Sequence, residues 1–412
     1  MSKTIILNVV VIILTLFTFL PTFIPYRFFA LIAAIAAVFI AVAVFLDGRY
    51  ITAYKEVVPI FFLLAVYCFN NYYLSIKSIN FIIYIICLLF IVINIYGFVE
   101  WIDMFICLSF ILGMLHAIST IILKFLPGIY LGIIAPLYPG TYTRLVEWYF
   151  SNCMPGLAEH YSTNGMYLVV GLFAAVAFGI RFCINKLYRL VIIGTFFVAI
   201  LMTGKRAHLL FSIFALFILY YIYLSNQKKN RFVKILGILL CVAVVGMIII
   251  LYFPSLGTAF TRFQESIDDG DVTSHRINIW QVAISLFWEN PLFGVGWGNF
   301  QNYYEIIRNY RAHAHNTYIQ LFCETGIIGA GIYIGWFVVL LVKTIKTLIN
   351  FRISNESTER VSHISFSLLM QVFFLVYCFT GNPLYEQQMY IPYFCACAIT
   401  YYYYVNYKKR KE

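Results

Sequence analysis

Long apolar runs, separated by short segments that carry the basic residues, are the feature that most constrains this 412-residue chain. Hydrophobic residues make up 63% of the sequence and charged residues 11%, against roughly a quarter charged in ordinary soluble domains. Each apolar run of about 18 residues or more predicts a helix that crosses a bilayer, because lipid offers no partner for an unpaired backbone group. The sequence therefore predicts an all-α, polytopic membrane protein.

About twelve runs meet this description. The expected spans lie near residues 4–24, 28–46, 56–73, 78–97, 103–123, 164–182, 189–203, 207–225, 232–253, 322–343, 362–381 and 389–405. The first run resembles a secretory signal, but it continues to Phe23 without a small-residue cleavage site. We expect it to remain as the first span of a single membrane domain, residues 1–412.

The net charge of +11 could indicate nucleic-acid binding, but the basic residues recur between the apolar runs and form no single patch. This distribution is typical of cytoplasmic loops in membrane proteins. With a cytoplasmic N-terminus, an even number of spans returns the basic residues 408–411 to the cytoplasm as well. The expected location is a bacterial cytoplasmic membrane, with lipids and not nucleic acid as neighbours.

Two segments assigned to the outer face are long: residues 124–163 and residues 254–316. Loops of this length are usually functional or disordered, and these two are rich in aromatic residues and glycine. Within the second, Ser274 is a possible N-cap and Asn290-Pro291 ends the pattern. Apolar residues recur between them at spacings of three and four: Ile277, Trp280, Ile284, Phe287 and Trp288. The pattern predicts an amphipathic helix that lies on the surface with this apolar side down.

Basic residues in two short segments are candidates for anion binding. Residues 203–208 join two predicted spans and include Lys205 and Arg206, which precede the free N–H groups of the next helix. The alternative is that both side chains only reach toward lipid phosphates. Arg276 stands in the first turn of the predicted surface helix, where its charge opposes the helix dipole. A phosphate or diphosphate contact would account for Arg276, and an exposed loop arginine is the alternative.

A third segment, residues 311–326, combines histidines with a polar stripe. Asn316 is a good N-cap for the next helix, on which Thr317, Gln320 and Glu324 share one face. A polar stripe on an apolar span normally faces a cavity or the interior of the helix bundle. His315 precedes this stripe and is a candidate general base for an attacking hydroxyl.

Other interpretations of this region are weaker. His315 could cap or hydrogen-bond instead, and His313 with His315 could ligate a metal, although no carboxylate stands at ligand spacing beside them. The acidic residues 268–271 could bind a divalent cation or form a solvated turn. The glycines of residues 294–298 follow no strand, which excludes a dinucleotide loop; they indicate close approach of backbone to backbone or to ligand.

Taken together, these segments resemble the O-antigen ligase and O-antigen polymerase superfamily. The resemblance rests on residues 203–207, on Arg276-Ile277-Asn278-Ile279-Trp280 with residues 290–296, and on residues 315–320 with Glu324-Thr325-Gly326. Residues 156–165, from Gly156-Leu157 to Asn164-Gly165, resemble the segment that precedes a span in many members. Direct similarity covers about the C-terminal half, and the motifs are specific for the superfamily but weak for the individual activity.

The resemblance implies a GT-C-like, inverting glycosyltransferase that uses an undecaprenyl-diphosphate-linked oligosaccharide donor and neither a metal nor a cofactor. It implies that Arg206 and Arg276 bind the donor diphosphate and that His315 activates the hydroxyl of a glycan or glycolipid acceptor. Lys205 stands where members often have a small residue, so its share in diphosphate binding is open, and His313 is an alternative base. Asn316, Gln320 and Glu324 would support the site from the extracytoplasmic end of their helix.

Several functions remain as alternatives. A ligase would transfer the finished chain to a lipid, protein or wall acceptor, whereas a polymerase would extend it. Abundant Ile, Tyr, Phe and Lys favour a capsule or exopolysaccharide polymerase on composition alone. A glycolipid flippase would have discontinuous helices in matched halves and charges at mid-membrane depth. A scaffold for other polysaccharide-assembly proteins would not depend on Arg206, Arg276 and His315.

Overall fold

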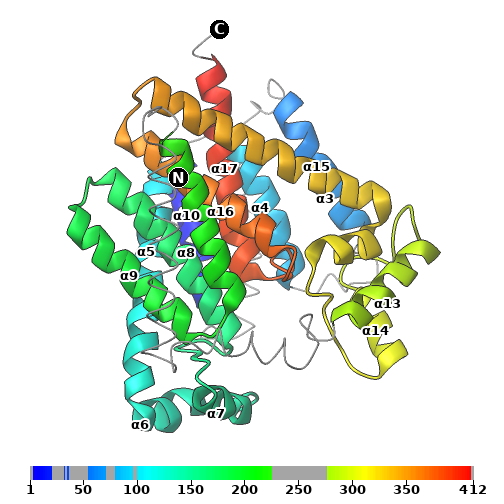
Figure 1. Ribbon diagram of the computed structural model, residues 1–412. Coiled ribbons are helices and arrows are strands. Elements are labelled where there is room, and N and C mark those ends of the chain that lie inside the picture. Colours follow the sequence, from blue (N-terminus) through cyan, green and yellow to red (C-terminus); the bar gives the residue numbers. More distant parts are fainter. Residues whose placement is uncertain are drawn as a thin grey trace. The chain divides into compact units, whose positions relative to one another are not determined.

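The computed structural model describes residues 3–20, 32, 35–36, 54–70, 79–95, 100–224 and 276–409, and every regular element within them is helical (Figure 1). The long helices are α1 (Lys3–Phe19), α3 (Tyr54–Asn70), α4 (Ile79–Asn94), α5 (Glu100–Phe125), α8 (Tyr161–Arg181), α9 (Lys186–Met202), α10 (Arg206–Tyr223), α15 (Thr317–Ile353), α16 (Thr358–Tyr377) and α17 (Gln387–Lys409). The shorter elements are α6 (Pro127–Ile129), η2 (Tyr130–Ile134), η3 (Ala135–Leu137), α7 (Tyr142–Phe150), α13 (Arg276–Glu289) and α14 (Phe300–Arg308). The all-α prediction is confirmed for the described residues.

Ten of the predicted spans overlap a described helix, while the runs near residues 28–46 and 232–253 lie almost wholly outside the described residues. Five of these helices are long and apolar enough to cross a membrane: α5, α8, α10, α15 and α16. The chain is therefore a membrane protein. A total of twelve spans and a GT-C-like arrangement stay predictions.

The chain divides into two compact units, which are described separately. The first comprises residues 1–105, 273–348 and 370–412, and the second comprises residues 106–272 and 349–369. In the first unit α17 packs against α4 and α1, and in the second α8 packs against α9 and α10.

Glycine allows two helices of the second unit to approach closely. A Cβ atom added to Gly113 of α5 would lie 2.4 Å from the Cα atom of Gly171 of α8. Small residues at such crossings are typical of membrane helices, which associate through close van der Waals contact.

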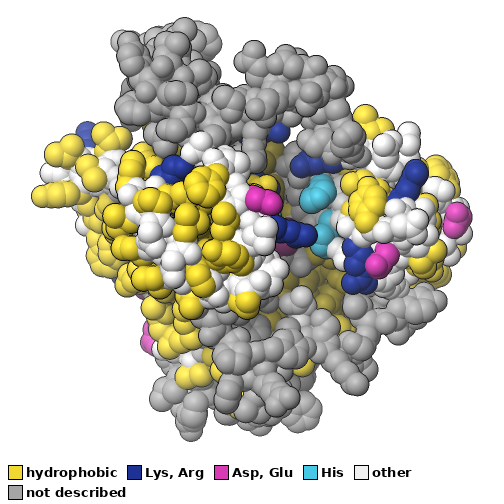
Figure 2. All heavy atoms as spheres, turned by 90° about the horizontal axis from the view of Figure 1, so that it is seen from below, with side chains coloured by type: hydrophobic (Ala, Val, Ile, Leu, Met, Phe, Trp, Pro, Cys, Tyr) yellow, Lys and Arg dark blue, Asp and Glu magenta, His cyan; other side chains and the backbone are white. Residues whose placement is uncertain are grey.

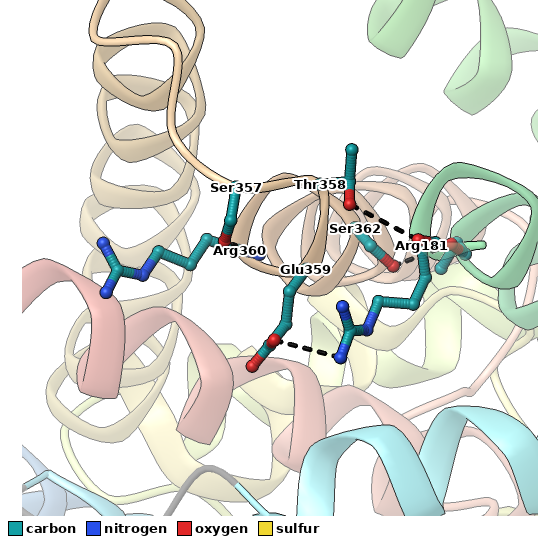
Figure 3. A network of polar contacts seen from close by, with 7 residues as sticks. Arg181, Ser357, Thr358, Glu359, Arg360 and Ser362 are labelled. Atoms are coloured by element: carbon teal, nitrogen blue, oxygen red, sulfur yellow. Dashed lines mark hydrogen bonds and ion pairs between the residues drawn. The ribbon is translucent and has the colours of Figure 1, made fainter. Parts of the chain in front are cut away.

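The C-terminal end of α8 and the N-terminal end of α16 are joined by a polar network in the second unit (Figure 3). Arg181 and Glu359 form an ion pair with an N···O distance of 3.0 Å, and the Ser362 hydroxyl donates to the carbonyl of Ala177 at 2.7 Å. The Thr358 hydroxyl also donates to the Arg181 carbonyl at 3.4 Å. The predicted topology assigns both helix ends to the cytoplasmic side, so this contact agrees with the assignment.

The segment predicted as the first long outer loop, residues 124–163, contains α6, η2, η3 and α7. Its buried side chains form a small core with Leu123 of α5 and Met202 at the end of α9: Tyr130, Ala135, Tyr138, Leu145, Tyr149 and Met154. This core gives the segment a fixed conformation.

The predicted surface helix exists as α13, but the prediction of its buried face is wrong. Ile277, Ile284 and Trp288 are exposed, the last by 71%. The buried side chains lie on the other face and pack against α14 and α15: Ile279, Val282, Ala283 and Leu286. Periodicity could not select the face because α13 is apolar on both sides. Ser274, the predicted cap, lies outside the described residues.

Candidate active site

The polar stripe predicted at the start of α15 is present and buried. The Asn316 carboxamide oxygen accepts hydrogen bonds from the backbone N–H groups of Tyr318 and Ile319 at 3.0 and 3.1 Å, so Asn316 caps the helix. Gln320 and Glu324 follow on one face, and their side chains are joined at 3.0 Å. Both residues are almost completely buried.

Glu324 fixes the segment between α13 and α14. Its carboxyl group accepts from the backbone N–H groups of Gly298 at 2.8 Å and Phe300 at 3.3 Å, in addition to the Gln320 amide. A buried carboxyl group needs such partners, because an unsatisfied polar group in an apolar surrounding is costly. Glu324 therefore has a structural role at the base of the site.

The glycines of residues 294–298 bring this segment against a break in α15. Gly326 interrupts the helix with a φ of 64° and a ψ of −172°, and a Cβ there would lie 2.3 Å from the backbone of Leu292. A Cβ at Gly294, whose φ is 71°, would lie 2.3 Å from the backbone of Glu324. The predicted close approach is confirmed, and it is an approach of backbone to backbone.

Asn70, at the end of α3, also holds this contact and was not predicted from the sequence. Its side-chain amide donates to the carbonyls of Phe293 at 2.6 Å and Glu324 at 3.2 Å. Its own carbonyl accepts from the backbone N–H of Trp297 at 2.6 Å. The available signal was a polar residue near the end of an apolar run, far from the motifs in the sequence.

The backbone on both sides of His315 is held by hydrogen bonds. The N–H of Ala314 donates to the Gln320 side chain at 3.2 Å, and the Ala314 carbonyl accepts from the Trp280 indole at 2.8 Å. After His315, the N–H of Thr317 donates to the carbonyl of Gly381 at 3.1 Å, and its hydroxyl donates to the same oxygen at 2.9 Å.

His315 itself has a φ of 50°, a conformation that is uncommon for residues other than glycine. The residue is exposed. Strained backbone of this kind persists where the surrounding structure determines it, and it is frequent at functional sites. An exposed imidazole on a fixed backbone is suited to meet a substrate hydroxyl.

His313 has a different environment. It is exposed, and its Nε2 atom is in hydrogen-bonding contact with the side-chain amide of Gln301 on α14. Figure 2 shows that histidine, Lys and Arg side chains reach the surface on the face drawn there. A histidine base can keep one ring nitrogen in such a contact while the other takes the proton, so His313 and His315 both stay candidates for the base.

Arg276 is half-buried at the start of the described part of α13, so the alternative of an exposed loop arginine is wrong. Its Nη1 atom donates to the carbonyl of Thr380 at 3.1 Å. Thr380 directly precedes Gly381, which binds Thr317. Arg276 and the loop of His315 are therefore attached to consecutive residues of one turn.

The hairpin of Lys205 and Arg206 belongs to the second unit. Gly204 turns the chain with a φ of 68°, and the N–H of Lys205 donates to the hydroxyl of Thr203 at 3.3 Å. The Nζ atom of Lys205 lies 4.9 Å from the ring centroid of Tyr161, at the start of α8. Arg206 is the first residue of α10 and is half-buried, which agrees with the predicted position at a helix N-terminus.

Tyr161, which lies under the Lys205 ammonium group, belongs to an aromatic cluster of the same unit. His160 stacks on Tyr161 with a centroid distance of 4.4 Å, and Trp148 packs edge-on against His160 at 4.4 Å. His160 caps α8, since its Nδ1 atom accepts from the backbone N–H of Ser162 at 2.9 Å. Burial lowers the pKa of His160 to about 4, and the charges of Lys205 and Arg144 act in the same direction.

The predicted upstream segment, residues 156–165, packs directly beneath the hairpin. A Cβ at Gly165 would lie 2.3 Å from Nδ1 of His208, which is completely buried in α10. The Asn164 amide donates to the Thr120 hydroxyl at 2.8 Å. The N–H of Met154 donates to the carbonyl of Met202, at the start of the hairpin, at 2.9 Å.

The predicted residues therefore fall into two groups. His313, His315, Asn316, Gln320, Glu324 and Arg276 lie in the first unit, and Lys205 and Arg206 lie in the second. Among the described residues, no three His, Cys, Asp or Glu side chains come together in a way that could hold a metal ion. The acidic residues 268–271 lie outside the part of the chain that the structure describes.

A comparison with known protein families matches residues 190–334 to a family described as O-antigen ligase. The comparison with curated proteins found no match. All eight predicted site residues lie within the matched segment. The match confirms the resemblance to the O-antigen ligase and polymerase superfamily that the motifs indicated.

Proposed function

We propose that this membrane protein, whose residues 190–334 match the O-antigen ligase family, transfers oligosaccharide from undecaprenyl diphosphate to a growing glycan on the outer face of a bacterial cytoplasmic membrane. The reaction inverts the anomeric carbon and uses neither a metal nor a cofactor. The product is a polymer of the O-antigen, capsule or exopolysaccharide type.

The observation that carries the proposal is the arrangement around His315. Its side chain is exposed, while hydrogen bonds hold Ala314 before it and Thr317 after it. Arg276 donates to the carbonyl of Thr380, and Thr317 donates to the carbonyl of the next residue, Gly381. The segments that carry Arg276 and His315 are therefore attached to the same turn. Transfer from a diphosphate donor requires a base for the acceptor hydroxyl and a cation for the diphosphate, both held in position.

In the proposed reaction, the acceptor hydroxyl oxygen attacks the anomeric carbon of the donor sugar and His315 takes the hydroxyl proton. The bond from that carbon to the diphosphate oxygen breaks, and its electron pair stays on undecaprenyl diphosphate. Arg276 neutralises the charge of this leaving group, so it needs no protonation. The resemblance to the superfamily gives Arg206 the same task and leaves the share of Lys205 open. Attack from the opposite face inverts the anomeric carbon.

Ligation is the second candidate, and the description of the matched family favours it. A ligase would use the same donor and the same base, and it would differ only in the acceptor that enters. Transport of a glycolipid is a more distant alternative, which would not require His315.

The test is glycan extension by the purified protein in nanodiscs, supplied with an undecaprenyl-diphosphate oligosaccharide in the presence of EDTA. We expect wild type to produce a ladder of longer lipid-linked chains, and His315→Ala and Arg276→Ala to abolish it. Arg308→Ala is the matched control, because Arg308 is an exposed arginine of the neighbouring helix α14.

The acceptor that receives the glycan distinguishes a polymerase from a ligase. Transfer only to an added non-repeat acceptor would make the protein a ligase. Absence of transfer to either acceptor, together with movement of labelled glycolipid across the membrane, would overturn the proposed function in favour of transport.

A further inference from the structure

The turn between α16 and α17, residues 380–382, lies outside the segment that the family comparison matches. Its residues contact both Arg276 and the segment around His315, which belong to the first unit. The Thr380 carbonyl accepts from Arg276, and the Gly381 carbonyl accepts from the N–H and the hydroxyl of Thr317.

Asn382 extends this contact to the residue before His315. Its amide donates to Oε1 of Gln320 at 2.9 Å, and the same oxygen accepts from the N–H of Ala314 at 3.2 Å. Asn382 is 2% exposed, so water does not readily replace this bond. With the Asn382 donor in place, the Gln320 oxygen stays directed toward Ala314, while its amide nitrogen binds Glu324.

The turn itself has little freedom. A Cβ at Gly381 would lie 2.5 Å from Cζ of Tyr377 on α16, so the turn packs against that helix. The N–H of Thr317 also donates to the carbonyl of Cys378 at 2.8 Å.

We propose that residues 380–382 hold both Arg276 and His315 in position. Asn382 is the positioning residue that acts on His315 through Gln320 and Ala314. The catalytic part of this proposal rests on the proposed function. Asn382 touches no reacting atom in this role. Its loss would lower the rate of transfer without weakening the binding of the donor.

The first measurement does not depend on activity. Hydrogen exchange at the backbone amides of residues 313–317 is followed by mass spectrometry in Asn382→Ala and in Asn382→Leu, which keeps the approximate volume. We expect exchange at Ala314 to become about tenfold faster in both variants. Asn406→Ala, which removes a similar amide bond to the Tyr402 carbonyl on α17, is expected to leave this exchange unchanged.

The second measurement is transfer. We expect Asn382→Ala to lower kcat about tenfold with KM for the donor unchanged. The double variant Gln320→Ala with Asn382→Ala should be no slower than Gln320→Ala alone, because Asn382 acts through Gln320. Unchanged exchange at Ala314, or faster exchange with an unchanged kcat, would overturn the proposal. A wild-type protein without transfer activity would overturn the proposed function instead, and the exchange experiment would still decide whether Asn382 holds this loop.

Discussion

The break in α15 that follows the loop of His315 and the packing around the hairpin of Arg206 both depend on glycine, but the glycines face different kinds of atoms. At the break in α15, backbone atoms meet backbone atoms: Gly294 faces the chain at Glu324, and Gly326 faces the chain at Leu292. At the hairpin, Gly165 faces the imidazole of His208. A side chain can move or be replaced and backbone cannot, so the two regions should respond differently to added volume.

The largest effect is expected from Gly326→Ala. The φ of 64° with a ψ of −172° is accessible almost only to glycine, and the added methyl group would lie 2.3 Å from the backbone of Leu292. We expect a loss of more than about 3 kcal/mol, seen as loss of folded, monodisperse protein after solubilisation. No second substitution nearby should restore it.

Gly331→Ala is the matched control on the same helix. A Cβ at Gly331 would have no atom within 4 Å, so its thermal unfolding temperature should stay at or slightly above that of wild type. A Gly326→Ala protein as stable as Gly331→Ala would show that the backbone contact is unimportant, and the contrast between the two regions would disappear.

The next effect concerns the two histidines of the loop. His315→Ala should lower kcat about 10²- to 10⁴-fold, the usual contribution of a general base. His313→Ala should lower it less than about tenfold, because in the proposed reaction His315 and not His313 takes the hydroxyl proton. Initial rates of chain extension decide between them. The reverse order would assign the base to His313.

The sequence allowed much of the loop to be predicted. The Asn316 cap, the stripe of Gln320 and Glu324 and the close approach of the glycines all follow from local spacing, and the structure confirms them. The wrong face of α13 came from a helix that has apolar residues on both sides, so spacing does not choose the buried side.

The long-range partners could not be predicted. Asn70 reaches Phe293 across 223 residues, and Asn382 reaches Gln320 across 62 residues. Both are polar residues near the ends of apolar runs. Local periodicity says nothing about which distant backbone such a residue will meet, because that depends on the packing of the helices.

A smaller effect is expected at the hairpin from Gly165→Ala, whose methyl group would meet the His208 ring. We expect a loss of about 1 to 3 kcal/mol, typical of overpacking in a buried site. The double variant with His208→Ala should recover part of this loss, which a thiol-reactive dye can follow through the buried cysteines during thermal unfolding. Strictly additive losses would mean that the two groups do not meet.

The smallest effect depends on pH and concerns His160, which caps α8 beside the hairpin. Because its pKa in the folded protein is about 4, against about 6.5 when unfolded, its contribution to stability is full above pH 6.5 and declines as the pH falls toward 4. Between pH 7 and pH 5 this loss is at most about 2 kcal/mol. His160→Asn keeps a capping side chain without the titrating ring, so its unfolding temperature should fall less over this range than that of wild type. Equal slopes for the two proteins would place the acid sensitivity elsewhere. A shallower slope for the variant would instead show that the hairpin region, unlike the backbone contact at the break in α15, depends on the protonation state of one side chain.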